Sequence, residues 1–176
     1  MPFGQVWAYT FRDGLILNLR DTSRAMSQEN VELAKILFPP SGTDLAPLIR
    51  DEDTYARMAE AVRPLLTDDF ESVMVWPAVT RTYAGLEGLR KNWLDWLEPW
   101  ATYRSTHEKL IDVGNHVVVL FRDHGRRESM ETEVELIGAV ILTFREGKLA
   151  RLASYAERAA AFETLGLSEQ DAHADS

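Results

Sequence analysis

Three ionisable residues of this sequence have the chemistry and the setting for acid–base catalysis: Asp123, His107 and Glu135. A carboxyl or imidazole group transfers protons well when its surroundings bring its pKa close to neutral. Asp123 closes the apolar stretch 117–121, and the alternative is that it is simply a turn residue. His107 lies in the polar stretch 103–109, where an exposed strand residue is the alternative to a base inside a cavity.

The third candidate, Glu135, belongs to an alternating series with Glu131 and Glu133. Alternate residues of a strand share one face of the sheet. Facing outward, the three carboxylates make an acidic stripe that discourages pairing with another sheet edge. Facing inward, Glu135 is a buried carboxylate whose pKa would be raised, and therefore a candidate base.

The sequence also contains aromatic residues that could form the wall of a small-molecule pocket. Aromatic side chains at helical spacing mostly pack in the core. Two or three of them around an apolar cavity with a polar group form a common type of ligand site. The residues that we expect to line such a pocket are Tyr55, Trp76, Trp93 and Tyr155.

Residue types and spacing exclude several other kinds of site. The chain has no cysteine, which excludes a thiol nucleophile, a disulfide scaffold, a cysteine-ligated zinc ion and an iron–sulfur cluster. No two of the four histidines share a metal-like spacing with an acid. The sequence has no glycine-rich phosphate loop, nucleophile elbow or Ser–His–Asp arrangement. We therefore expect neither a metal nor a cofactor.

Length and charge limit the partners of the protein. A chain of 176 residues corresponds to one domain. Its net charge of −9 argues against nucleic acid and against an anionic membrane as partners. The start of the chain does not resemble a signal peptide. The longest apolar stretch, 137–142, is far shorter than the roughly 20 residues that span a bilayer. We expect a cytoplasmic protein.

The elements that must position the candidate residues change from helices to strands along the chain. Apolar spacing predicts helices at 27–38, 51–66, 85–98 and 156–165, and strands at 70–76, 102–112, 116–123, 130–145 and 148–155. Helices followed by hairpin-linked strands indicate an α+β fold, with an antiparallel sheet covered by the helices on one face. The long strand at 130–145 is expected to bend or bulge near Gly138.

The first 25 residues resemble the last hairpin of the same chain. Residues 10–19 and 143–152 are identical at five of ten positions, at a constant offset of 133. Convergence of two hairpins with an acid–glycine turn is one explanation. The other is that strands at 6–12 and 15–20, joined by Asp13-Gly14, are a relic of a preceding copy. We therefore divide the chain into a hairpin extension at 1–25, a domain at 26–168 and an acidic tail at 169–176. The extension would dock on an exposed sheet edge.

Five stretches in a consistent order make residues 26–168 resemble the SnoaL-like group of the nuclear transport factor 2-like superfamily. They are 26–33 (MSQENVEL), 83–90 (YAGLEGLR), 111–119 (IDVGNHVVV), 142–149 (LTFREGKL) and 155–162 (YAERAAAF), the last followed by Gly166-Leu167. The resemblance implies a cone-shaped α+β barrel, in which a curved antiparallel sheet wraps around N-terminal helices and leaves a pocket at the open end. It also implies a homodimer built through the sheet.

The resemblance leaves the reaction open, because the superfamily includes polyketide cyclases, steroid isomerases, epoxide hydrolases, dehydratases and non-catalytic modules. Steroid isomerase-like members carry a base carboxylate where this chain has Trp76. Epoxide hydrolases need two aspartates and an arginine together, but Asp123 and the adjacent Arg122 must point to opposite faces of a strand. Both departures argue against those two reactions.

Two hypotheses for function remain. In the first, the protein binds a small apolar or polycyclic molecule in the cone pocket, with or without cofactor-free acid–base chemistry. In the second, it is a non-catalytic dimeric interaction module whose sheet forms the interface. The first requires at least one carboxylate or histidine inside the cone, whereas the second requires a large apolar sheet surface between two chains.

Overall fold

The structure is a computed structural model that describes the backbone of residues 14–168 and the side chains of residues 25–168. Its helices are α1 (Gly14–Leu37), α2 (Leu45–Arg50), α3 (Glu52–Val62), the short 3-10 helix η1 (Arg63–Leu65), α4 (Gly85–Leu97) and α5 (Arg158–Thr164). Its strands are β1 (Leu66–Trp76), β2 (Val79–Ala84), β3 (Thr102–Val113), β4 (His116–Arg126), β5 (Val134–Arg145) and β6 (Lys148–Tyr155).

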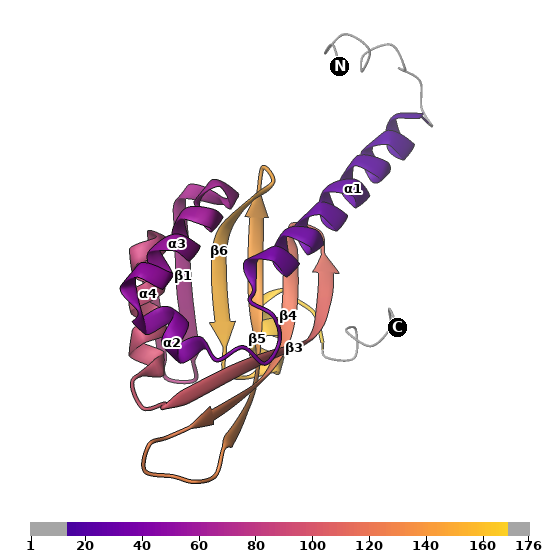
Figure 1. The fold of residues 1–176 in the computed structure, drawn as a ribbon. Coiled ribbons are helices and arrows are strands. Elements are labelled where there is room, and N and C mark those ends of the chain that lie inside the picture. The colour runs from indigo at the N-terminus through magenta and orange to yellow at the C-terminus, as the bar shows by residue number, and fades with distance from the viewer. Residues whose placement is uncertain (1–13, 169–176) are drawn as a thin grey trace.

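The strands form one curved, open sheet in the order β2-β1-β6-β5-β4-β3 (Figure 1). Neighbouring strands run antiparallel except β1 and β6, which are parallel. The chain passes from β2 at one edge of the sheet to β3 at the other, and returns through β4 and β5 to β6. Helix α4 contacts β1 and β2, while α1 and α2 contact β3. The predicted α+β fold with a curved sheet against N-terminal helices is confirmed, with the one parallel pair as an addition.

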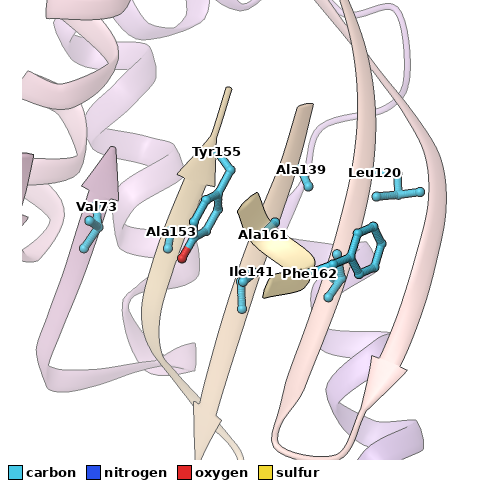
Figure 2. Close-up of a cluster of buried hydrophobic side chains, with 9 residues drawn as sticks. Val73, Leu120, Ala139, Ile141, Ala153, Tyr155, Ala161 and Phe162 are labelled. Atoms are coloured by element: carbon cyan, nitrogen blue, oxygen red, sulfur yellow. The ribbon is translucent and has the colours of Figure 1, made fainter. Parts of the chain in front are cut away.

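Strand alternation gives the sheet two faces with different coverings. In β4, Val117 and Val119 pack in the core between the sheet and the N-terminal helices. Val118 and Leu120 point the other way, into a cluster that α5 closes with Phe162 (Figure 2). We call these two sides of the sheet the inner face and the outer face. A residue of β4 therefore belongs to the inner face when its number is odd.

The N-terminal segment differs from the sequence-based expectation. Residues 14–37 form one helix, so the strand expected at 15–20 is wrong. The hairpin signal at Asp13-Gly14 is local, whereas residues 15–37 contain neither proline nor glycine and are rich in good helix formers. The other expected strand, 6–12, and the tail at 169–176 lie outside the described residues. The origin of the first 25 residues in a preceding copy, the edge on which they dock and the homodimer stay predictions.

Hydrogen bonds tie the second half of α1 to the β3–β4 turn. Ser27 Oγ donates to the Asp112 carboxylate, and Asn30 Nδ2 donates to the carbonyl oxygen of Gly114 at 3.3 Å. Pro39 and Pro40 end the helix, because proline lacks an N–H donor and clashes with the preceding turn. This attachment places the last turn of α1 beside β3, at the inner face of the sheet.

Gly138 is required by a close approach and not by the expected bulge. The β4–β5 register runs without a shift past the pair Phe121 and Gly138, and the irregularity in β5 lies further on, between Thr143 and Phe144. A Cβ at position 138 would lie 2.4 Å from Phe121 Cζ and 2.4 Å from the carbonyl oxygen of Tyr155. Only glycine leaves room for both atoms.

Replacing this glycine should therefore strain the centre of the sheet. We expect Gly138→Ala to lower the free energy of unfolding by about 1–3 kcal/mol, as overpacking of a core does. Urea denaturation followed by circular dichroism measures the loss. Thr80→Ala, at an exposed position of β2, is the control and should change stability by no more than about 0.5 kcal/mol. Equal stability of Gly138→Ala and the wild type would contradict the close approach.

Candidate functional site

A cavity of about 250 Å³ lies between the inner face of the sheet and the helices α1 to α4. Its wall is mostly aliphatic and aromatic, and includes Ile49, Met58, Leu89, Val119, Val140 and Leu152. These residues come from two helices of the N-terminal half, from α4's first turns and from three central strands. The curvature of the sheet and the helices packed across it therefore enclose an apolar space, which is the usual setting of a small-molecule site.

One side of the cavity is a cluster of aromatic rings. Trp93 and Trp96 of α4 approach the Tyr103 ring at centroid distances of 6.4 Å and 5.9 Å, both edge to face. Trp76, at the end of β1, lies 4.9 Å from Trp96 and is 37 % exposed. Trp76 therefore extends the aromatic wall from the interior to the solvent.

Asp123 is the buried carboxylate of the site. It is 4 % exposed and, with its odd position in β4, faces the cavity. Tyr103 Oη donates a hydrogen bond to Oδ2 at 2.7 Å, and Ser105 Oγ donates to Oδ1 at 2.5 Å. Burial raises the pKa of the Asp123 carboxyl above its ordinary value, although these two hydrogen bonds act in the opposite direction.

His107 also borders the cavity, on the same face of β3 as Tyr103 and Ser105. Its ring lies 4.5 Å from the ring of Phe38, which follows the last turn of α1. Burial lowers the pKa of His107 below its ordinary value, so the neutral imidazole is favoured. The register pairs Ser105 with Asp123 and His107 with Phe121, so the acid and the imidazole are near neighbours on the wall.

Glu135 lies on the opposite face of the sheet from the cavity. Its carboxylate accepts a hydrogen bond from Arg122 Nη1 at 2.6 Å and lies 3.6 Å from His124 Nε2. Arg122 also binds Glu108, which in turn pairs with Arg158. Of the two alternatives for Glu135, the outward-facing one holds. The structure does not bring Glu135 together with Asp123 and His107.

The four aromatic residues expected to line the pocket all border the cavity, but their rings and hydroxyl groups have different surroundings. Trp76 and Trp93 stand in the aromatic cluster, and Tyr55 of α3 lines the cavity while its hydroxyl donates to the carbonyl oxygen of Leu86 at 2.7 Å. Burial raises the pKa of Tyr55 to about 12. Tyr155 also borders the cavity, but its ring packs in the outer-face cluster beneath α5 (Figure 2).

Four polar residues of the wall were missed by sequence reasoning: Tyr103, Ser105, Asn92 and Ser154. The first two alternate with His107, so the spacing 103, 105, 107 was a signal that all three share a face. Asn92 of α4 is 5 % exposed, and its Nδ2 donates to Ser72 Oγ at 2.8 Å. Its Oδ1 atom is buried and has no hydrogen-bond partner within the described residues.

The charge of the cavity wall is one-sided. Among the lining residues, all within the described part of the chain, there is neither a lysine nor an arginine. Arg122, next to Asp123 in sequence, points to the outer face and is engaged there by Glu108 and Glu135. No group of three or more potential metal ligands occurs within residues 25–168. The ionisable chemistry of the cavity therefore rests on one carboxyl, one imidazole and the tyrosine hydroxyls.

A family model described as SnoaL-like domain matches residues 53–152, which is more than half of the chain. The chain belongs to the SnoaL-like family. This result confirms the SnoaL-like resemblance seen in the sequence. The matched range contains β1 to β5, most of β6 and the carboxyl of Asp123. No curated protein matches the sequence.

Solved structures support the fold of this SnoaL-like chain. A putative SnoaL-like polyketide cyclase from Jannaschia sp. CCS1 aligns with a TM-score of 0.54 at 18 % identity, over 72 % of this chain and 84 % of that one. A phenazine biosynthesis-related protein from Pseudomonas aeruginosa aligns with a TM-score of 0.54 at 15 % identity, over 77 % and 83 %. At these identities the likeness shows the fold alone. No helix in the described part of the chain is long and apolar enough to cross a membrane.

The hydrogen bond from Tyr103 should stabilise the fold by holding the buried carboxylate. We expect Tyr103→Phe to lower the free energy of unfolding at neutral pH by about 1–3 kcal/mol, because it removes a donor from a buried acceptor. Tyr83→Phe is the matched control, since it removes a hydroxyl that binds Asp95 at 3.0 Å on the surface, and it should cost much less. Urea denaturation measures both. Equal losses would show that the Tyr103 hydroxyl has no special role.

The raised pKa of Asp123 gives a signed pH dependence of stability. As pH rises above the ordinary value of 3.8, the unfolded state ionises first, so the folded state loses stability until pH passes the raised pKa. Asp123→Asn cannot ionise. We therefore expect the free energy of unfolding of the wild type to fall relative to this variant as pH rises from about 4, until pH passes the raised pKa. Asp95→Asn is the control: the pKa of Asp95 is lowered by Lys91 and Tyr83, so no such fall should occur.

Proposed function

We propose that the protein binds a small apolar ring compound in the inner-face cavity, and that Asp123 performs cofactor-free acid–base chemistry on it. The observation that carries the proposal is a single buried carboxyl group in the wall of a mostly apolar cavity. A fold does not need such a group, because an aliphatic side chain would continue the apolar stretch of β4 without the cost of burying a charge. A buried carboxylate that makes folding less favourable indicates a functional role.

The size of the cavity favours a compact ligand. A cavity of about 150 Å³ is large enough to bind benzene. At about 250 Å³, the cavity is just below the range of roughly 300–1,000 Å³ typical of ligand pockets. A molecule of two fused rings fits this volume, and a larger polycyclic compound would need to extend past Trp76 into the solvent.

The surroundings of Asp123 favour removal of a proton from a carbon acid. A carboxylate in an apolar cavity with a raised pKa is a stronger base than one in water. In the proposed step, the carboxylate takes a proton from the carbon next to a ligand carbonyl, and the resulting enolate takes the proton back at the same or another atom. Tyr103 and Ser105 hold the carboxylate in one orientation. His107, kept neutral by burial, is a second group that could exchange protons with the ligand.

The names of the structural neighbours are compatible with this proposal. One is titled a putative polyketide cyclase and another a phenazine biosynthesis-related protein. Cyclisation of a polyketide joins a carbanion to a carbonyl carbon, and it begins with the same proton removal. We extend from those names only the general reaction class, proton transfer at a carbon next to a carbonyl.

A bicyclic ketone, 2-tetralone, tests binding and proton transfer in one experiment. We expect the protein to accelerate the exchange of the acidic C–H of 2-tetralone for deuterium in D₂O, which NMR follows. Asp123→Asn should lower this catalysed rate by roughly 10²–10⁴-fold. Leu136→Trp should weaken binding at least tenfold by filling the cavity, whereas Val79→Trp, at an exposed position outside it, should not.

The possible outcomes separate binding from catalysis. Binding without catalysed exchange would overturn the acid–base step and leave a ligand-binding protein. Exchange that survives in Asp123→Asn would move the chemistry to another residue, with His107 as the next to test. A second bicyclic probe, 2-naphthol, tests binding alone. If 2-tetralone and 2-naphthol both fail to bind, the proposal falls, and the non-catalytic dimeric module becomes the better hypothesis.

A further inference from the structure

Around Asp123, the hydroxyl donors of the cavity wall are already engaged, which leaves acceptor capacity on the carboxylate. The hydroxyls of Tyr103 and Ser105 already donate to Asp123, and the hydroxyl of Tyr55 donates to the backbone. An ionised carboxylate has room for about four hydrogen bonds. Asn92 Oδ1 adds a buried acceptor that has no partner within the described residues. A ligand that carries N–H or O–H donors therefore suits this wall better than one that carries only acceptors.

The buried carboxylate has no cationic partner. Asp123 forms no ion pair with any residue in the described part of the chain. The nearest arginine in sequence, Arg122, is on the outer face with Glu108 and Glu135. A buried charge without an opposite charge is costly, and a cation that enters the cavity removes much of this cost. An anionic ligand would meet the same carboxylate with nothing to offset the repulsion.

The aromatic wall favours the same sign of charge. The ring of Tyr103, whose hydroxyl binds Asp123, is also in contact with Trp96 and Trp93. The faces of tryptophan and tyrosine rings attract cations, most strongly where water is excluded. The carboxylate and the tryptophans therefore lie on one side of the cavity, where an ammonium group could touch both.

We propose that the ligand of this cavity carries a protonated amine, which binds the Asp123 carboxylate while the ring body of the ligand lies against Trp93 and Trp96. The inference rests on the ligand-binding part of the proposed function and replaces its acid–base step, because a carboxylate that pairs with an ammonium group is no longer free to take a proton from carbon. It goes further by naming the ligand class: a compact ring compound with a basic nitrogen. Binding involves no bond formation, and the ammonium supplies the opposite charge that the chain itself lacks.

Three probes with the same bicyclic body and different charges test this inference by titration calorimetry at pH 7.5. They are 2-naphthylmethylamine, which is a cation, 2-naphthylmethanol, which is neutral, and 2-naphthoate, which is an anion. We expect the amine to bind at least tenfold more tightly than the alcohol, and the anion at least tenfold more weakly. Asp123→Asn should remove the preference for the amine while the alcohol keeps its affinity within about threefold.

The control variant is Glu135→Gln, which removes one acidic group of the same formal charge from the outer face. It should leave all three affinities unchanged, which separates a local effect of Asp123 from the general attraction of a protein with net charge −9. Retained binding of the alcohol by Asp123→Asn also shows that the variant is folded with an intact cavity.

The outcomes distinguish this inference from the proposed function. If the alcohol binds as tightly as the amine, or if Asp123→Asn still prefers the amine, the inference is overturned while the apolar cavity remains a ligand site. If Glu135→Gln weakens amine binding as much as Asp123→Asn does, the preference is a long-range effect and the inference is again overturned. If none of the three probes binds, this inference falls, and binding of 2-tetralone decides whether the proposed function survives.

Discussion

The carboxyl group of Asp123 is held inside an apolar wall by two hydroxyl groups, and the candidate site depends on that arrangement. Neither hydroxyl comes from its own strand: Tyr103 and Ser105 both lie on β3. The carboxyl therefore keeps its place only while β3 and β4 stay in register, which pairs Asp123 with Ser105. The same two-residue period that sends Val117 and Val119 into the core also aims Asp123 at the cavity.

The shape of the cavity depends on positions where a side chain is absent. A Cβ on Gly125 would lie 2.5 Å from the Trp100 ring, so glycine allows that ring to pack flat on the end of β4. Trp100 in turn contacts Trp96 and Tyr103 and supports the aromatic side of the wall. Gly138 has the same role at the middle of β5, where Phe121 crosses over it. The aromatic cluster beside Asp123 is thus supported from the sheet as well as from α4.

The sequence predicted the features that follow from local patterns. Strand and helix periods located most of the elements from 51 to 165, although β2 (Val79–Ala84) was missed. The end of an apolar strand pointed to Asp123. The face to which the Glu135 side chain points could not be predicted in this way. It depends on the pairing of Asp123 with Leu136, because the adjacent Glu135 then lies on the opposite face of the sheet. The hydroxyl donors on β3 were missed for the same reason, since cross-strand register is set by the whole sheet.

The N-terminal segment shows a different limit of sequence reasoning. The turn signal at Asp13-Gly14 and the similarity to 143–152 both favoured a hairpin, whereas the backbone from residue 14 onward is helical. The later segment has strand neighbours on both sides of its hairpin, and a strand gains most of its stability from such neighbours. In the earlier one, residues 15–37 run on without a helix breaker into the part of α1 that Ser27 and Asn30 anchor. Residues 14–19 and 147–152 therefore show that similar short sequences can adopt different structures in different surroundings.

The polar groups at the inner face do not contribute to stability in proportion to their burial. The raised pKa of Asp123 means that its ionised form opposes folding at neutral pH, even with both hydrogen bonds in place. Asn92 Oδ1 adds a second buried group without a hydrogen-bond partner within the described residues. By contrast, the outer face places its charges in pairs, such as Arg122 with Glu108 and Glu135. The chain thus satisfies its charges where it needs only a stable surface, and leaves acceptors unsatisfied around an apolar cavity. A ligand with donor groups would relieve that imbalance, so binding and stability are expected to be coupled in this protein.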